Sequence, residues 1–295
     1  MREGAAAGPG LRACGADGAR CIVRDHAAAQ VVPRTSGPLI RARAVIAAGA
    51  LAALGTARAG PAPDQPLVVA VEDQASPWSQ PDGTGYANDV VRTAFAAAGV
   101  DVRFRVVPYA RCKQLVVRGA EAACFSMSRE PGIDSVVALA DAPLFTCAVG
   151  FFERRAAPLG VARAAGLQRR TVVGVVLGYE YPESLRDLVR RGVLVFEPAP
   201  SEEINLRKLA AGRLDAALVN YDVVKTPDYV AASAGVRGRV RPAFDAGLLP
   251  SYIGFSRRHP RGAWALGRFN VGMRRIAADG RLRDIERRWV HAVTP

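Results

Sequence analysis

Segments of strand type alternate with segments of helix type from residue 66 onward, and this order constrains the fold more than any other feature. Three apolar strand-type runs are separated by two stretches whose apolar residues recur every three or four positions. In chain order these segments are 67–71, 90–98, 102–107, 109–119 and 122–126. A β-α-β-α-β order predicts a parallel sheet with helices on both faces.

A second series of the same kind follows an extended apolar run at 147–152. Its alternating strands and helices are predicted at 171–177, 182–191, 193–196, 202–214 and 216–219. Pro182 in a first helical turn and Ser201 as an N-cap suit the starts of the two helices. A last strand at 252–255 precedes two apolar-striped helices that Gly280 separates. Two such series predict two lobes joined by a hinge.

Residues 39–59 have the pattern of a signal peptide. Arg41 and Arg43 precede a short apolar stretch, and Ala57-Arg58-Ala59 offers small residues at a cleavage site. A buried Ala-rich helix is the alternative interpretation. Residues 1–38 show no periodicity, so we expect an unstructured extension or a start that lies downstream, near Val31. The pattern predicts export with cleavage near Ala59.

The basic charge of the chain is dispersed. The formal net charge is +13, but residues 1–59 hold eight of the 40 basic and three of the 27 acidic residues, so the rest carries +8. These basic residues lie along predicted helices and do not alternate with aromatic residues. Nucleic-acid binding favours a concentrated basic face, so we expect a solvated surface and no nucleic-acid partner.

Five cysteines are present, and Cys14 and Cys21 precede the predicted cleavage site. Among Cys112, Cys124 and Cys147, one pair could form a disulfide in an oxidising compartment and leave one thiol free. The sequence does not identify the pair. The spacing is not that of metal ligands, so we expect buried structural cysteines and no metal or cofactor.

Several short motifs in a fixed order resemble the extracellular solute-binding proteins of family 3, which serve polar amino acid ABC importers. The resemblance covers residues 66–290. The motifs are Pro77-Trp78, Asp82-Gly83, Gly85-Tyr86-x-x-Asp89, Pro108-Tyr109-x-Arg111-Cys112, Gly174-Val175, Gly178-Tyr179, Gly212-Arg213-Leu214-Asp215-Ala216 and Gly280…Ile285…Trp289. Each is weak alone, and together they are fairly specific.

The resemblance implies an α/β fold of two lobes, the type II arrangement of periplasmic binding proteins, with a parallel-rich sheet flanked by helices in each lobe. Two hinge strands are expected near 147–153 and 243–256. Lobe 1 would comprise 60–150 and 250–295, and lobe 2 would comprise 151–249. The family further implies a periplasmic monomer that closes on a small polar solute and meets an ABC permease or another membrane partner.

Amino acid binders of this family hold the ligand carboxylate with an arginine and its ammonium with an acid. The arginine position falls on Ile133 in this chain, and the acid position falls on Asn220. Arg129 and Asp222 could substitute only along different backbone paths. The resemblance therefore implies a solute that is not an ordinary α-amino acid, with Arg129 as the expected anchor if the solute is anionic.

Polar and aromatic residues near the predicted strand ends are candidates for contact with a solute, because ligands of open α/β sheets bind beyond the carboxyl ends of the strands. The candidates are Trp78, Tyr86, Arg111, Ser126, Ser128, Arg129, Gly178, Tyr179, Asn220 and Tyr221. Three of them have other plausible roles: loop packing for Trp78, capping of the first helix for Tyr86, and a surface ion pair for Arg111.

Binding without chemistry is the leading functional prediction. The sequence shows no nucleophile motif and no phosphate-binding glycine loop, and only His259 lies between residues 60 and 290. One alternative is a dehydratase-like enzyme on the same fold, with Glu180 or Asp222 as the acid. Another is a sensor or accessory protein that takes no part in transport.

Overall fold

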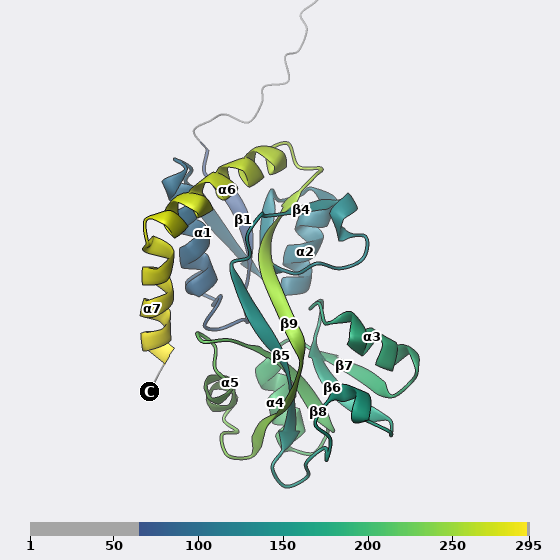
Figure 1. The fold of residues 1–295 in the computed structure, drawn as a ribbon. Coiled ribbons are helices and arrows are strands. Elements are labelled where there is room, and N and C mark those ends of the chain that lie inside the picture. The colour runs from purple at the N-terminus through teal and green to yellow at the C-terminus, as the bar shows by residue number, and fades with distance from the viewer. Residues whose placement is uncertain (1–64, 294–295) are drawn as a thin grey trace, which may run out of the picture. The chain divides into compact units, whose positions relative to one another are not determined.

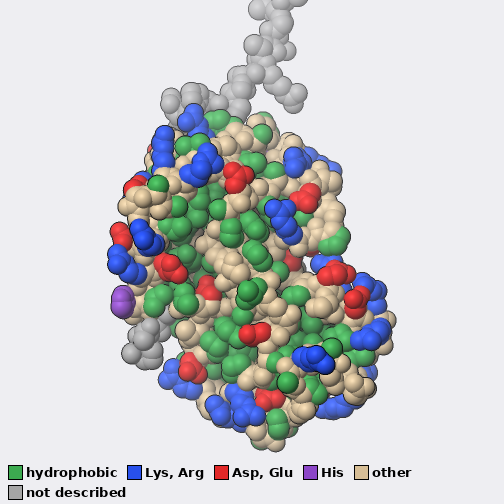
Figure 2. Space-filling view, viewed as in Figure 1, with side chains coloured by type: hydrophobic (Ala, Val, Ile, Leu, Met, Phe, Trp, Pro, Cys, Tyr) green, Lys and Arg blue, Asp and Glu red, His purple; other side chains and the backbone are tan. Residues whose placement is uncertain are grey.

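A computed structural model describes residues 65–293. The predicted extension and signal peptide, residues 1–59, lie outside the described residues. Within the described part, no helix has the length and apolar character needed to cross a membrane. Lysine and arginine side chains on the face shown in Figure 2 are scattered around the periphery and do not form one patch.

The first predicted series is confirmed and forms most of one lobe, here called lobe 1. Its elements are β1 Leu67–Glu72, α1 Tyr86–Ala97, β2 Val102–Val107, α2 Tyr109–Arg118 and β3 Ala123–Met127. Strand β1 pairs in parallel with both β2 and β3. A disulfide between Cys112 and Cys124 joins α2 to β3, and Cys147 is a free, buried thiol.

The second predicted series is also confirmed and forms lobe 2. Its elements are η2 Ala164–Gly166, β6 Thr171–Val176, α3 Glu183–Arg190, β7 Leu194–Ala199, α4 Glu202–Ala210, β8 Ala216–Tyr221 and α5 Pro227–Ser233. Strand β6 pairs in parallel with β7 and β8. Helix α4 is shorter than predicted because Gly212 has a φ of 75° and the chain turns there. Ser201 caps α4, as expected, through a hydrogen bond from the backbone N–H of Ile204.

Two long antiparallel strands, β5 Phe145–Arg154 and β9 Val240–Ser256, run along the middle of the molecule (Figure 1). Strand β5 lies between β9 and β8 and pairs with both. The C-terminal end of β9 pairs with β3 and with β4 Val137–Leu139. The strand order is β2-β1-β3-β9-β5-β8-β6-β7. The two-lobed fold with two hinge strands, predicted from the sequence, is confirmed.

Separate apolar cores support the two lobes. One core of lobe 1 includes Phe95, Phe125 and Phe269, and a core of lobe 2 includes Phe151 and Leu185. The short helix η1 Ile133–Ser135 lies between β3 and β4 in the chain. Helices α6 Gly262–Ala278 and α7 Arg281–Val293 pack on α1 of lobe 1.

The contact between α6 and α1 depends on Gly272. A Cβ atom at this position would lie 1.8 Å from the carbonyl oxygen of Ala94. We expect Gly272→Ala to lower the free energy of unfolding by about 1–3 kcal/mol, because the two helices must move apart. Gly267→Ala is the matched control, since a Cβ there meets no atom within 4 Å and alanine favours the helix. Urea denaturation of both variants tests the expectation, and equal stabilities would contradict it.

Candidate functional site

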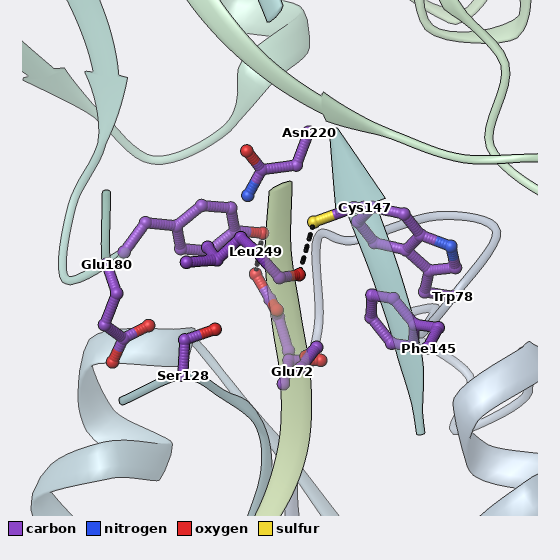
Figure 3. Close-up of a pocket in the computed structure, with 11 residues that line it drawn as sticks. Glu72, Trp78, Ser128, Phe145, Cys147, Glu180, Asn220 and Leu249 are labelled. Carbon is purple, nitrogen blue, oxygen red and sulfur yellow. Dashed lines mark hydrogen bonds between the residues drawn. The ribbon is translucent and has the colours of Figure 1, made fainter. Parts of the chain in front are cut away.

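The carboxyl ends of parallel strands from the two lobes face one small cavity. Lobe 1 contributes Glu72 at the end of β1 and Ser126 near the end of β3, and lobe 2 contributes Asn220 in β8. The remaining lining residues are Trp78, Ser128, Phe145, Cys147, Tyr179, Glu180, Leu249 and Ser251. In Figure 3, Glu180 and Ser128 lie on one side and Trp78 and Phe145 on the other, with Glu72 and Cys147 between them. This is where the fold is expected to bind a ligand.

The cavity is nearly filled by the chain itself. The space in it that the centres of water-sized molecules can occupy is about 20 Å³. A single water needs roughly 10–15 Å³ by this measure, so the closed cavity has room for one or two waters and for no organic solute of ordinary size.

Glu72 is a buried acid of the cavity whose pKa is strongly raised. Its side chain is buried, and its Oε1 accepts a hydrogen bond of 2.5 Å from the Tyr179 hydroxyl. Burial raises its pKa to about 8, although the Tyr179 hydrogen bond and the charge of Lys225 oppose this shift. Glu72 is therefore largely protonated at neutral pH in this closed form.

Three buried polar atoms around the cavity have no hydrogen-bond partner among the described residues. They are Oε2 of Glu72, Oγ of Ser126 and Oδ1 of Asn220. Buried polar atoms are nearly always paired, and an unpaired one costs about 1–3 kcal/mol. Ser126 also has a φ of 67°, in a region that residues with a side chain rarely occupy. Backbone strain of this kind is concentrated at binding sites. The arrangement suits a ligand or water that meets these atoms.

Glu180 also lines the cavity, but its carboxylate is occupied. The Tyr109 hydroxyl donates to both carboxylate oxygens at 2.8 Å, and Lys113 Nζ lies 2.8 Å from Oε1. Burial raises the Glu180 pKa, and the charge of Lys113 opposes the rise. Because Lys113 also pairs with Glu130 at 2.7 Å, the three residues form a network whose charge is partly balanced.

An aromatic wall closes the opposite side of the cavity. The rings of Trp78 and Phe145 are stacked with centroids 4.4 Å apart, and Lys225 Nζ lies 4.4 Å from the Trp78 ring. Asp222 accepts a hydrogen bond of 3.0 Å from the Trp78 indole N–H. Its other oxygen accepts from the backbone N–H groups of Val224 and Lys225, so Asp222 orders a loop and lies outside the cavity lining.

A buried ion pair supports the backbone of Asn220. Lys225 Nζ lies 2.5 Å from Oε2 of Glu202, and both side chains are buried. Oε1 of Glu202 accepts a hydrogen bond of 2.7 Å from the Asn220 backbone N–H. The pair thus fixes the end of β8 against the cavity.

The structure brings five of the ten candidate residues to the cavity: Trp78, Ser126, Ser128, Tyr179 and Asn220. Ser128 is also hydrogen-bonded to the hinge, since its hydroxyl donates to the Pro250 carbonyl at 2.8 Å.

The other five candidates lie elsewhere. Tyr86 and Tyr221 line a separate groove together with Thr146, Ala148 and Leu248. The Tyr86 side chain forms no helix cap, because its hydroxyl donates to the Leu144 carbonyl.

Arg111 and Arg129 are exposed, and Arg129 lies near Asp134 and the Tyr252 ring. Gly178 contacts Ala110 of α2, where an added Cβ would lie 3.0 Å from the Ala110 Cβ. Ile133, at the position of the family arginine, packs into the lobe 1 core.

Sequence reasoning missed five lining residues: Glu72, Phe145, Cys147, Leu249 and Ser251. Glu72 directly follows the predicted strand 67–71, so the rule on strand ends could have identified it. The residues of β5 and β9 carry no such signal, because the register between two distant strands determines which of their side chains face the cavity.

Solved structures share this fold. A histidine kinase sensor domain with similarity to periplasmic binding proteins aligns with a TM-score of 0.64 at 21% identity, covering 76% of this chain and 96% of that one. The arginine-, lysine-, histidine-binding protein ArtJ from Geobacillus stearothermophilus aligns with a TM-score of 0.63 at 13% identity, covering 76% and 95%. An ancestral amino acid-binding protein, a precursor of cyclohexadienyl dehydratase, gives 0.60 at 17% identity, covering 76% and 94%.

These similarities establish a two-lobed, periplasmic-binding-protein-like fold. No protein-family model matches the sequence, and no curated protein matches it. The fold alone does not determine the function, which depends on the residues of the site.

Proposed function

We propose that this chain is a solute-binding protein that encloses a small polar molecule between its lobes. The observation that carries the proposal is the set of three unpaired buried atoms, from Glu72 and Ser126 in lobe 1 and Asn220 in lobe 2. A solute that meets all three would connect the lobes and satisfy groups that are otherwise costly to bury.

The charge of the cavity favours a cationic or neutral solute. The eleven lining residues include the carboxyl groups of Glu72 and Glu180 and no arginine or lysine. A primary ammonium group would stabilise the deprotonated form of Glu72 and could donate to Glu72, Asn220 and Ser126, whereas an anion would lie beside the carboxylate of Glu180. The exposed position of Arg129 and the core position of Ile133 support a solute that is not an ordinary α-amino acid.

The cellular setting belongs to the same proposal. The predicted leader and the fold are in keeping with export to the periplasm, where the chain would act as a monomer. Delivery of the solute to an ABC permease is the partner role that we favour. The lobes would comprise 60–150 with 250–295, and 151–249.

A sensor or accessory role is the second candidate, because the cavity between the closed lobes is nearly filled by the chain itself and a histidine kinase sensor domain is among the structural neighbours. The dehydratase alternative has less support. Of its two candidate acids, Glu180 is hydrogen-bonded to Tyr109 and Lys113, and Asp222 lies outside the cavity lining.

A screen of matched small molecules tests the proposal. Amines, alcohols and carboxylates on the same short carbon skeletons are added to the purified protein near pH 8, and thermal unfolding is recorded. We expect some amines to stabilise the protein, by about 2.7 kcal/mol at a hundredfold excess over Kd, and carboxylates to have no effect.

Two variants define the site in this screen. Glu72→Gln should remove the preference for amines, while Arg129→Ala should leave it unchanged because that side chain is exposed. Stabilisation by carboxylates that disappears in Arg129→Ala would refute the proposed cavity. Stabilisation by no member of the screen would favour the accessory role.

A further inference from the structure

The two lobes are held together by the chain's own side chains. Four groups of hydrogen bonds connect residues of lobe 1 with residues of lobe 2 across the cleft. They join Glu72 to Tyr179, Tyr109 and Lys113 to Glu180, Trp78 to Asp222, and Ser76 to Tyr229. With the cavity reduced to about 20 Å³, these contacts describe a closed cleft that has no room for a solute of ordinary size.

Tyr179 of lobe 2 reaches into the cavity and contacts Glu72 of lobe 1 directly. It follows β6 in lobe 2, directly after Gly178, whose φ of 89° turns the chain toward lobe 1. Its ring packs edge-on against Tyr109, with centroids 5.2 Å apart, and its hydroxyl donates to the buried carboxyl of Glu72. A side chain of lobe 2 thus makes the interaction with lobe 1 that a solute donor would make.

We infer that Tyr179 is a built-in occupant of the solute site, which closes the cleft in the absence of solute and competes with solutes for Glu72. The competition rests on the proposed solute binding, while the closure does not. Any solute must displace the phenol or be small enough to fit beside it, so Tyr179 determines both affinity and permitted size. The apparent affinity equals the intrinsic affinity multiplied by the fraction of molecules in which the phenol has left Glu72.

Removal of the phenol should leave a hole that fits it. Tyr179→Ala creates a cavity lined by Glu72 and Tyr109, and p-cresol has the structure of the side chain that was lost. Engineered cavities in protein interiors bind small molecules of matching shape. We expect p-cresol to bind Tyr179→Ala in calorimetry, and toluene to bind at least about tenfold more weakly because it offers no donor to Glu72.

The rate at which the free thiol of Cys147 is alkylated measures how often the cleft opens. Cys147 is buried there, with its Sγ 3.4 Å from the Leu249 carbonyl oxygen, so it reacts with iodoacetamide only when the cleft opens. The rate of its alkylation, followed by mass spectrometry of the Cys147 peptide, should rise at least about tenfold in Tyr179→Ala. Added p-cresol should return the rate to that of the original protein.

Two conservative variants keep the test decisive if the alanine variant folds poorly. Tyr179→Phe removes only the hydroxyl and should also speed alkylation. Tyr181→Phe is the matched control, because the Tyr181 hydroxyl interacts with the Val176 backbone N–H within lobe 2. Alkylation that is unchanged in both Tyr179 variants, or toluene binding equal to that of p-cresol, would overturn the inference. Failure of the solute screen would not overturn the inference, since neither p-cresol binding nor the alkylation of Cys147 needs the natural solute.

Discussion

The protein should lose stability as the pH rises from about 4.5 to about 8, and Glu72→Gln should remove much of this loss. Burial raises the Glu72 pKa from 4.5 to about 8 in the folded protein. Between these values the folded state binds more protons than the unfolded state, so the free energy of unfolding decreases with pH. If the whole shift is expressed, the decrease attributable to Glu72 is about 5 kcal/mol at most.

Other buried groups surround Glu72, so the difference between two proteins is the quantity to measure. Tyr179 donates to Glu72, and the charges of Lys225, Glu202 and Asp73 act on it. Urea denaturation from pH 4.5 to 9 of the original protein and of Glu72→Gln gives the difference curve. The curve should fall with pH and level off above about pH 8.

The exposed carboxylate of Glu183 on α3 offers a matched control. Glu183→Gln should give a difference curve close to flat. A difference curve for Glu72→Gln that rises with pH would mean that the closed form holds Glu72 as a carboxylate.

Lys225→Met should be the most destabilising of the single substitutions considered. It removes the partner of Glu202 in a pair whose side chains are 1% and 4% exposed. Burial of an uncompensated charge costs about 3–5 kcal/mol. The variant also loses the contact between Lys225 and the Trp78 ring.

The double variant Lys225→Met with Glu202→Gln separates charge from packing. With both charges removed, no buried ion is left alone, and most of the lost stability should return. Urea denaturation of both single variants and of the double variant completes the cycle. A loss below about 1 kcal/mol in Lys225→Met would contradict the expectation, as would a double variant no more stable than the single one.

The fold could be predicted because its information is local. Apolar runs such as 67–71 and helical spacing such as 90–98 predict each element separately, and their order indicates the parallel sheets. The residues at which long strands begin and end are harder to predict from local patterns. The predicted strand 252–255 is the end of β9, which extends back to Val240 because β5 pairs with it across ten residues.

The site could be predicted only in part, since side-chain direction depends on tertiary contacts. Strand ends located Ser126, Ser128 and Asn220 at the cavity. Arg111 and Arg129 follow the same rule in sequence, but their side chains point to solvent. The burial that raises the Glu72 pKa comes from both lobes at once, so no local pattern reveals it.

The pairing of β5 with β9 limits how the cleft can open. Backbone hydrogen bonds run along both strands from Phe145 to Arg154, with register shifts beside Val149 and Phe151. Sliding of one lobe past the other would break this ladder, whereas twisting of the two-stranded ribbon keeps it. Gly247 has a φ of 149° beside the first shift, so we expect the ribbon to twist most easily there. Opening should therefore be a small rotation about the ribbon axis.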